Sequence, residues 1–259
     1  MPETPKSAYN PTSPAVAQAA QILMLLGNTP GHAPGVSEIC NAVGIHKSKG
    51  FSILNTLAAC DFVTKDPRTK TYRLGPALIP LGRKAIENCD IAAVARDHLE
   101  RLAGKTGASV LLGIICNDQL YITAKYDGNQ TVSVTIRQYQ SLHITHGSHG
   151  KAIFAHLDKT EQQRILAAGP VFFHGLSGHV DLERLDAELA FCRKNGYAVD
   201  NEEITPGIRA VSAPVFDGRN RVFAAMVVLG TFGENQLTRL GEMTAETSRI
   251  ISRQMGAGS

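Results

Sequence analysis

Apolar residues recur at helical spacing in two short stretches near the start of the chain, residues 36–43 and 51–57. Gly44 lies between them, where the absence of a Cβ allows the positive φ that ends many helices. Ser37 and Ser48 can each cap the helix that begins beside it, because a serine oxygen accepts one of the unpaired amides of a first turn. The pattern predicts a helix, a tight turn and a second helix, as in a helix-turn-helix.

The segments on either side decide between this motif and an ordinary helical hairpin. Residues 15–27 form a good helix with an apolar stripe and can complete a three-helix core. After Cys60, the β-prone runs 62–65 and 71–74 flank an Asp-Pro turn. Three helices followed by a hairpin are typical of a winged helix-turn-helix, whose second motif helix enters the major groove of DNA.

Helical periodicity continues beyond the hairpin and then gives way to strands. Residues 77–86 and 91–102 each carry an apolar stripe, and the first stripe can be covered by its own chain or by a second copy. The expected strands cover residues 109–116, 119–126, 131–139, 196–203, 208–216 and 221–230, and the expected helices cover 150–156, 159–168, 181–195 and 236–255. Strands with helices grouped between and after them predict an α+β domain with an antiparallel sheet.

These patterns divide the chain into a disordered leader (1–14), a winged helix-turn-helix (15–75), a linker helix (76–90) and a larger domain (91–259). The leader lacks the pattern of a signal peptide, and no apolar run reaches the ~20 residues that span a bilayer. The five cysteines include no C-x-x-C pair, which favours reduced thiols over a disulfide framework. We therefore expect a cytoplasmic protein without a membrane partner.

The net charge of the chain is concentrated in the predicted winged helix. The whole chain has 26 Lys and Arg against 23 Asp and Glu, a net charge of +3. Residues 1–75 contain seven of the bases and four of the acids, so the rest of the chain is neutral overall. A solvated basic face would give the same count, but bases at a helix start and on a wing are placed to neutralise DNA phosphates. The sequence therefore predicts binding to double-stranded DNA.

The residues expected to contact DNA are Lys47, Ser48, Lys49, Phe51, Ser52, Asn55, Arg68, Lys70 and Arg73. The five basic residues are expected at phosphates. Phe51, Ser52 and Asn55 are expected nearest to base edges, if the helix docks by its N-terminal end.

Other groups of residues give weaker evidence for a functional site. His143, His146 and His149 suggest a metal site, but on a strand the middle histidine points away from the other two, and no Cys or acid is near in sequence. The turn 147–150 opens a helix instead, and the first amides of a helix attract anions. No nucleophile elbow, zinc-protease motif, P-loop or dinucleotide-binding motif occurs. We expect no metal, no cofactor and no enzymatic activity.

From about residue 15 to about residue 252, the chain resembles the IclR family of transcriptional regulators. The segments that carry the resemblance are AQILMLLG, VSEICNAVGIHKSKGFSILNTL and TYRLGPAL in the N-terminal part, and HGSHGKAIFAHL, NGYAVDNEEITPGIRAVSAPVFD and AAMVVLG in the C-terminal part. The resemblance implies a winged helix, a linker helix and a GAF-like effector domain. It also implies dimers, or dimers of dimers, on DNA.

The resemblance also implies a pocket for a small-molecule effector. The corresponding residues are Thr131, Val134, Ser148, His149, Asp200, Ala210, Val227 and Leu229. His149 stands where the family often has a small residue, and we expect the pocket to be partly apolar and partly cationic when this histidine is protonated. The family usually begins its recognition helix with K-S-T-x-x-R, whereas residues 47–52 read KSKGFS, with a glycine in the helix and no arginine.

The sequence thus predicts an effector-responsive, sequence-specific regulator, most simply of a catabolic operon, that binds an inverted repeat as a dimer. The expected effector is a small carboxylic or phenolic acid seated over the turn 147–150, with His149 as a donor and Asp200 accepting from a ligand hydroxyl. A neutral sugar or an amine held by Asp200 is the alternative ligand. The alternative function is a GAF-like sensor that acts through protein partners, with the N-terminal domain used only for dimerisation.

Overall fold

A computed structural model of the protein describes residues 13–29, 32–87, 90–129, 140–175 and 180–258. The chain divides into two compact units, Met1–Asn88 and Cys89–Ser259. Most of the expected leader and the expected strand 131–139 lie outside the described residues. No described helix is both long and apolar enough to cross a membrane.

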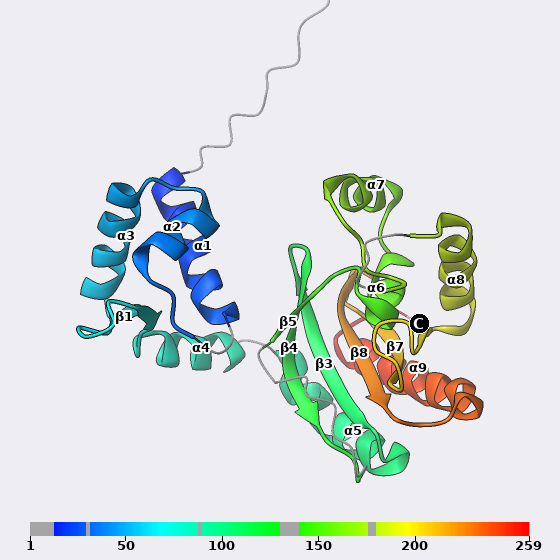
Figure 1. The fold of residues 1–259 in the computed structure, drawn as a ribbon. Coiled ribbons are helices and arrows are strands. Elements are labelled where there is room, and N and C mark those ends of the chain that lie inside the picture. The colour runs from blue at the N-terminus through cyan, green and yellow to red at the C-terminus, as the bar shows by residue number, and fades with distance from the viewer. Residues whose placement is uncertain (1–12, 30–31, 88–89, 130–139, 176–179, 259) are drawn as a thin grey trace, which may run out of the picture. The chain divides into compact units, whose positions relative to one another are not determined.

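The N-terminal unit contains three helices, a two-stranded wing and a fourth helix (Figure 1). The elements are α1 (Pro14–Asn28), α2 (Val36–Val43), α3 (Lys47–Ala59), β1 (Val63–Lys65), β2 (Tyr72–Leu74) and α4 (Leu78–Glu87). The wing strands pair antiparallel, with Val63 opposite Leu74. A single core holds α1, α2, α3 and the wing together through buried residues such as Ile22, Ile39 and Leu54. The predicted winged helix-turn-helix is confirmed.

The caps of the two motif helices differ from the prediction. Gly44 ends α2 in the left-handed conformation, with φ of 69°, as expected. Helix α2 begins two residues earlier than a Ser37 cap requires, and the Glu38 carboxylate accepts the Gly35 amide at 2.7 Å. The cap of α3 is His46, whose Nδ1 lies 2.9 Å from the Ser48 hydroxyl. Both serines therefore lie inside the first turn rather than before it.

Close packing between α2 and α3 explains the glycine inside the recognition helix. Gly50 is buried, and a Cβ built on it would lie 2.2 Å from Sγ of Cys40 in α2. Real Cβ atoms do not approach so closely, so with the Cys40 sulfur in this position α2 and α3 pack at this separation only with glycine at position 50. The close contact offsets the ~1 kcal/mol by which glycine disfavours a helix relative to alanine.

The C-terminal unit is a three-layer α+β domain. Its helices are α5 (Asp90–Thr106), α6 (Gly147–Phe154), α7 (Lys159–Ala168), α8 (Leu182–Asn195) and α9 (Leu237–Gln254), with a short 3-10 helix, η1 (Glu234–Gln236). Its strands are β3 (Ser109–Cys116), β4 (Gln119–Tyr126), β5 (Ser141–His143), β6 (Ala198–Asn201), β7 (Arg209–Phe216) and β8 (Val222–Gly230). They form one antiparallel sheet in the order β5-β4-β3-β8-β7-β6. The predicted fold class is confirmed.

Two separate cores cover the two faces of this sheet. Along β8, Ala225, Val227 and Leu229 belong to the core under α6, α7 and α8. The residues between them, including Met226 and Val228, belong to the core under α5 and α9 (Figure 1). Side chains alternate between faces along a strand, so a central strand buried on both sides is apolar at nearly every position. Helix α6 begins at Gly147, three residues before the predicted start.

The contact between Gly50 and Cys40 predicts a measurable penalty. Gly50→Ala should lower the free energy of unfolding of the N-terminal unit by about 1–3 kcal/mol, the usual cost of overpacking a core. Urea denaturation of the full chain, followed by hydrogen exchange of α2 and α3, measures this change. Removing the sulfur in Cys40→Ala/Gly50→Ala should recover much of the loss. The matched control is Gly104→Ala in α5, where a Cβ meets nothing within 4 Å and alanine should be neutral or stabilising.

Candidate functional site

A pocket opens on the face of the sheet that carries α6. Its volume is about 350 Å³, within the range of sites for small molecules. Its described lining is Gln140, Leu142, His146, Gly147, Ser148, His149, Asp200, Ile204, Thr205, Ile208, Ala210, Val227 and Leu229. The apolar members come from β5, β7, β8 and the loop after β6, and the polar ones gather at the start of α6 and at Asp200. The described lining contains no Lys or Arg.

The start of α6 offers backbone donors to this pocket. Gly147 adopts φ of +52°, and its amide donates to the Phe172 carbonyl at 3.1 Å. The amides of Ser148 and His149 belong to the first turn, and neither has a hydrogen-bond partner among the residues that the structure describes. Unpaired first-turn amides attract negative or partly negative ligand atoms. The Ser148 hydroxyl is already paired with the Ser212 hydroxyl at 2.7 Å.

The expectation of a cationic His149 is wrong. The side chain is only 4% exposed, and burial lowers its pKa to about 3, so the ring is neutral at ordinary pH. Its Nε2 lies 3.1 Å from the His143 carbonyl and donates to it. The ring also stacks on His146, with centroids 5.7 Å apart. A neutral imidazole that already donates to the backbone cannot serve as a charged donor to a ligand.

Asp200 supplies the acidic group of the pocket. The carboxyl is buried, and its Oδ1 accepts the amides of Glu203 at 2.8 Å and Ile204 at 3.4 Å. Its Oδ2 faces Gly147, where a Cβ would approach this oxygen to 2.8 Å. Burial raises the pKa of Asp200 to about 6, although nearby Lys151 opposes the shift. Near neutral pH the Asp200 carboxylate thus accepts hydrogen bonds, and in mild acid the protonated carboxyl group can donate one.

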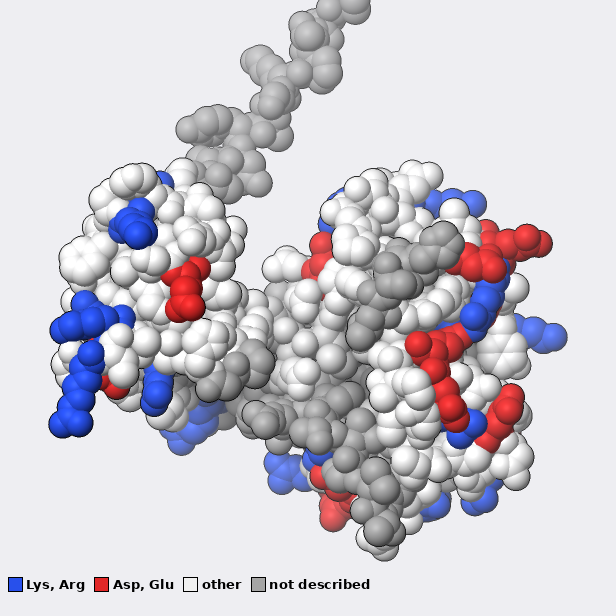
Figure 2. Space-filling view, in the orientation of Figure 1, with Lys and Arg blue, Asp and Glu red and all other residues white. Residues whose placement is uncertain are grey.

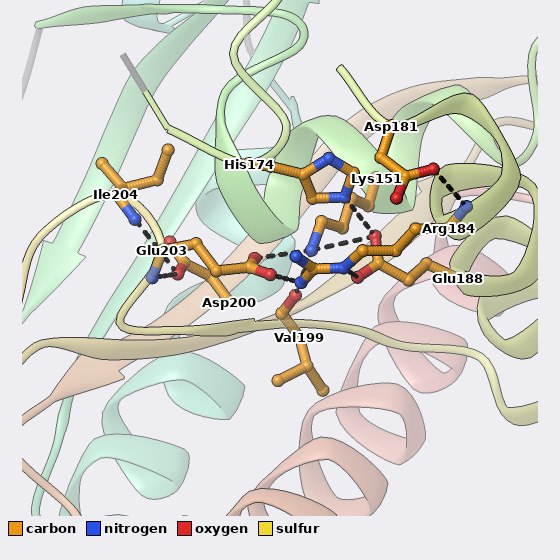
Figure 3. Close-up of polar contacts among 9 residues, drawn as sticks. All are labelled: Lys151, His174, Asp181, Arg184, Glu188, Val199, Asp200, Glu203 and Ile204. Atoms are coloured by element: carbon orange, nitrogen blue, oxygen red, sulfur yellow. Dashed lines mark hydrogen bonds and ion pairs between the residues drawn. The ribbon is translucent and has the colours of Figure 1, made fainter. Parts of the chain in front are cut away.

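Next to Asp200 lies an ion-pair network centred on the buried Lys151 (Figure 3). The Lys151 side chain is 1% exposed, and its Nζ lies 2.6 Å from Glu203, 3.0 Å from Glu188 and 3.1 Å from the Val199 carbonyl. Arg184 on α8 pairs with both glutamates. Three acceptors satisfy the three donors of an ammonium group, which offsets the cost of removing it from water. Burial still lowers the pKa of Lys151, while Glu188 opposes that shift.

The same network contains the one three-residue group with metal-like spacing found in the described part of the chain. Ligand atoms of His174, Glu188 and Glu203 all lie within 4.8 Å of one another. The Lys151 ammonium lies between the two carboxylates, and His174 Nε2 is 2.8 Å from Glu188. Lysine therefore supplies the positive charge that a metal ion would bring to these carboxylates.

The predicted DNA-contacting residues are all exposed on the N-terminal unit. Six lie on α3, Arg73 lies on β2, and Arg68 and Lys70 lie in the turn of the wing. Figure 2 shows basic side chains over α3 and the wing. The turn is fixed by Asp66, whose Oδ1 accepts the amides of Arg68 at 2.7 Å and Thr69 at 3.1 Å.

Six of the eight residues predicted to bind the effector line this pocket. They are Ser148, His149, Asp200, Ala210, Val227 and Leu229. Thr131 and Val134 lie outside the described residues. Of the other lining residues, only Gly147 belongs to the turn expected under the effector; the rest were not predicted, and neither were Lys151, Glu188 and Glu203. The run NEEITPGI after β6 was a usable signal for Ile204, Thr205 and Ile208, because it continues directly from Asp200.

Comparisons with known proteins cover nearly the whole chain. Residues 15–67 match the IclR helix-turn-helix domain, and residues 83–253 match the C-terminal domain of bacterial transcriptional regulators of the IclR type. The chain belongs to the IclR family. The IclR match also decides between the two alternative functions, because the N-terminal domain is of a DNA-binding type. The protein is a DNA-binding transcriptional regulator with an effector-binding C-terminal domain, not an enzyme.

Individual IclR relatives agree with this assignment. The uncharacterized regulator RhmR of Escherichia coli is 31% identical over 248 residues, which cover 94% of each chain. The regulator XynR of the same organism is 27% identical, over 95% of this chain and 98% of its own. An IclR transcriptional regulator from Alicyclobacillus acidocaldarius has a similar structure, with a TM-score of 0.82 and 28% identity over 95% of this chain and all of its own.

The Lys151 network predicts that removing the ammonium group strongly lowers stability. Removing the charge of one of its partners as well should restore part of the loss. Lys151→Met keeps much of the side-chain volume but leaves Glu203 and Glu188 without their buried cation. The free energy of unfolding of the C-terminal unit should fall by about 3–5 kcal/mol, as when one partner of a buried pair is removed. Chemical denaturation at pH 7 measures the loss. The double variant Lys151→Met/Glu203→Gln should regain part of it, and a single variant as stable as wild type would contradict this role.

Proposed function

We propose that the protein binds an inverted-repeat operator as a dimer and regulates genes for the breakdown of a small organic acid, which is its effector. The observation that carries the effector part is the pocket, where unpaired helix amides face one end and apolar strand residues form the walls. Family membership carries the DNA-binding part. Effector binding would act by favouring the arrangement of the dimer to which it binds more tightly.

The charge and exposure of the N-terminal unit support the proposed DNA contacts. Lys47 and Lys49 lie in the first turn of α3, and Arg68, Lys70 and Arg73 lie on the wing. These side chains can reach phosphates on either side of a groove occupied by α3. In the C-terminal unit the acids and bases nearly balance, so a comparable excess of bases is absent from the sequence there.

Exposed apolar residues on α4 support dimer formation. Ile79 is 73% exposed and Leu81 is 54% exposed, whereas Leu78 is half-buried. The predicted stripe also includes Ala85 and Ile86, whose side chains lie outside the described part. Large apolar side chains that remain in water on one chain gain free energy when a second copy covers them. A dimer, or a dimer of dimers, would also match the two-fold symmetry of an inverted repeat.

The lining of the pocket supports an effector that is a carboxylic acid with a hydroxyl group, bound without a charged donor from the protein. The carboxylate would accept from the amides of Ser148 and His149, and Val227 and Leu229 would pack against the apolar body. Asp200 lies at the same end as the amides, and its Oδ2 would pair with the ligand hydroxyl, accepting from it when ionised and donating to it when protonated. Because His149 is neutral, the backbone amides and the helix dipole replace it as the anion-binding groups.

The DNA contacts predict a change in salt dependence. Lys49→Ala/Arg68→Ala should weaken binding to every duplex and reduce the slope of log K against log salt by about 1 for each lost phosphate contact. Fluorescence anisotropy between 50 and 200 mM salt, on an operator and on a scrambled duplex, measures both effects. The control is the exposed pair Lys159→Ala/Lys194→Ala of the C-terminal unit, which should leave the slope unchanged. An unchanged slope in the first variant would remove these two residues from the interface.

Asp200 predicts how effector binding depends on pH. A carboxylate ligand binds more readily when Asp200 is protonated, and the pKa of this group in the free protein is about 6. The affinity for an acid effector should therefore rise as pH falls from 8 towards 5, by at most about tenfold per pH unit above 6. A thermal-shift screen of hydroxylated organic acids at pH 5.5 and 8, followed by calorimetry of the hits, tests this.

The control is Asp200→Asn, which should bind the acid with little pH dependence over this range. An amine effector would behave in the opposite way, because it loses its ionised partner in acid. Hits that are only amines, or acids whose affinity rises with pH, would overturn the acid proposal while leaving the DNA-binding function intact.

A further inference from the structure

The rotation of α3 about its axis is fixed by its buried residues. Gly50, Ile53, Leu54 and Leu57 face the core, and Gly50 lies against Cys40 of α2. The helical period of 3.6 residues then places Ser48, Ser52, Asn55 and Ala59 along the middle of the opposite face. All four are exposed. This stripe is the part of α3 that would lie deepest in a major groove.

Basic residues are absent from the middle of this face. All of α3 is described, and its only cations are Lys47 and Lys49, both in the first turn and on the flanks of the stripe. Arginine and lysine are the usual partners of guanine O6 and N7. The Ser48 hydroxyl is paired with His46, and the Thr56 hydroxyl donates to the Ser52 carbonyl at 3.1 Å. The polar group left free in the stripe to read a base through two hydrogen bonds is the Asn55 amide.

Phe51 lies on the flank of the stripe that faces the wing. The residue is 47% exposed, so its ring is accessible to a partner. Lys65 of β1 holds the ring in place, with Nζ 5.6 Å from its centroid and 5.5 Å from the centroid of the buried Tyr72. The wing thus positions an apolar ring beside the stripe, next to basic residues that would contact phosphates.

These contacts define the bases that the helix can recognise. A carboxamide forms two hydrogen bonds with N6 and N7 of adenine, and an apolar side chain packs against the 5-methyl group of thymine. We propose that each operator half-site is read at one adenine by Asn55 and at one thymine by Phe51, with Lys65 positioning the Phe51 ring. This inference rests on the proposed binding to an inverted repeat and adds which bases are recognised.

The first experiment finds the half-site. The full-length protein selects from a pool of duplexes in which two inverted half-sites are randomised. The selected half-sites should share an adenine and a thymine at fixed positions. Half-sites that share only G·C pairs would overturn the proposal. Failure to retain any duplex, even at low salt, would instead contradict the proposed DNA-binding surface, so the two failures are distinguishable.

The second experiment removes single atoms from the DNA. Replacing the shared thymine with deoxyuridine removes only the methyl group and should weaken wild-type binding about fourfold per half-site, the effect of burying one such carbon. Replacing the shared adenine with 7-deazaadenine removes N7 and should weaken it on the order of tenfold. Phe51→Ala should lose the response to deoxyuridine alone, and Asn55→Ala should lose the response to 7-deazaadenine alone.

Lys49→Ala is the matched control, because it should weaken binding to all of these duplexes equally and keep both responses. Lys65→Met keeps the length of the side chain but removes its charge, and it should reduce the deoxyuridine response without affecting the 7-deazaadenine response. All four substitutions are at exposed positions, so the folded protein can be compared directly. Equal responses in wild type and in Phe51→Ala or Asn55→Ala would exclude the corresponding base contact.

Discussion

The geometry of the C-terminal unit, which contains the pocket, depends on the burial of the Lys151 ammonium group. Lys151 projects from the fully buried helix α6, and its three acceptors come from β6, from the loop after β6 and from α8. An unpaired charge at this depth would cost several kcal/mol, so these segments must converge on it. The amide of Glu203, one of the acceptor residues, also donates to Asp200. The pairing of Lys151 with Glu203 thus also orients Asp200, the acidic group of the pocket.

Burial also sets the chemistry of that pocket. It makes His149 neutral and raises the pKa of Asp200, so the site contains fewer charges than its residue types suggest. In the proposed function, recognition of an acid would then fall to backbone dipoles, which do not titrate. The acidic group, Asp200, changes state close to neutral pH. A ligand that bears both a carboxylate and a hydroxyl suits this combination better than a simple anion or a simple amine does.

In the proposed complex with DNA, different residues of the N-terminal unit would provide affinity and specificity. The bases expected to contact DNA lie in the first turn of α3 and on the wing, whereas the middle of the outward face of α3 is uncharged. Phosphate contacts give affinity for any duplex, and groups at base edges distinguish one duplex from another. Gly50 connects the two tasks, because the close packing that requires it also fixes which residues of α3 face outward. The glycine inside the recognition helix is thus explained by packing within the motif.

The sequence by itself determined the fold class, most element types, the position of the DNA-binding domain and six residues of the pocket. These depend on local periodicity, on turn residues, on charge along the chain and on a family resemblance. It did not reveal the Lys151 network, because Lys151 is 37 residues from Glu188 and 52 from Glu203 in the chain. It also gave the wrong charge for His149 and the wrong caps for α2 and α3. Burial, pKa values and close contacts depend on what the rest of the chain places around a residue, so only the tertiary structure decided them.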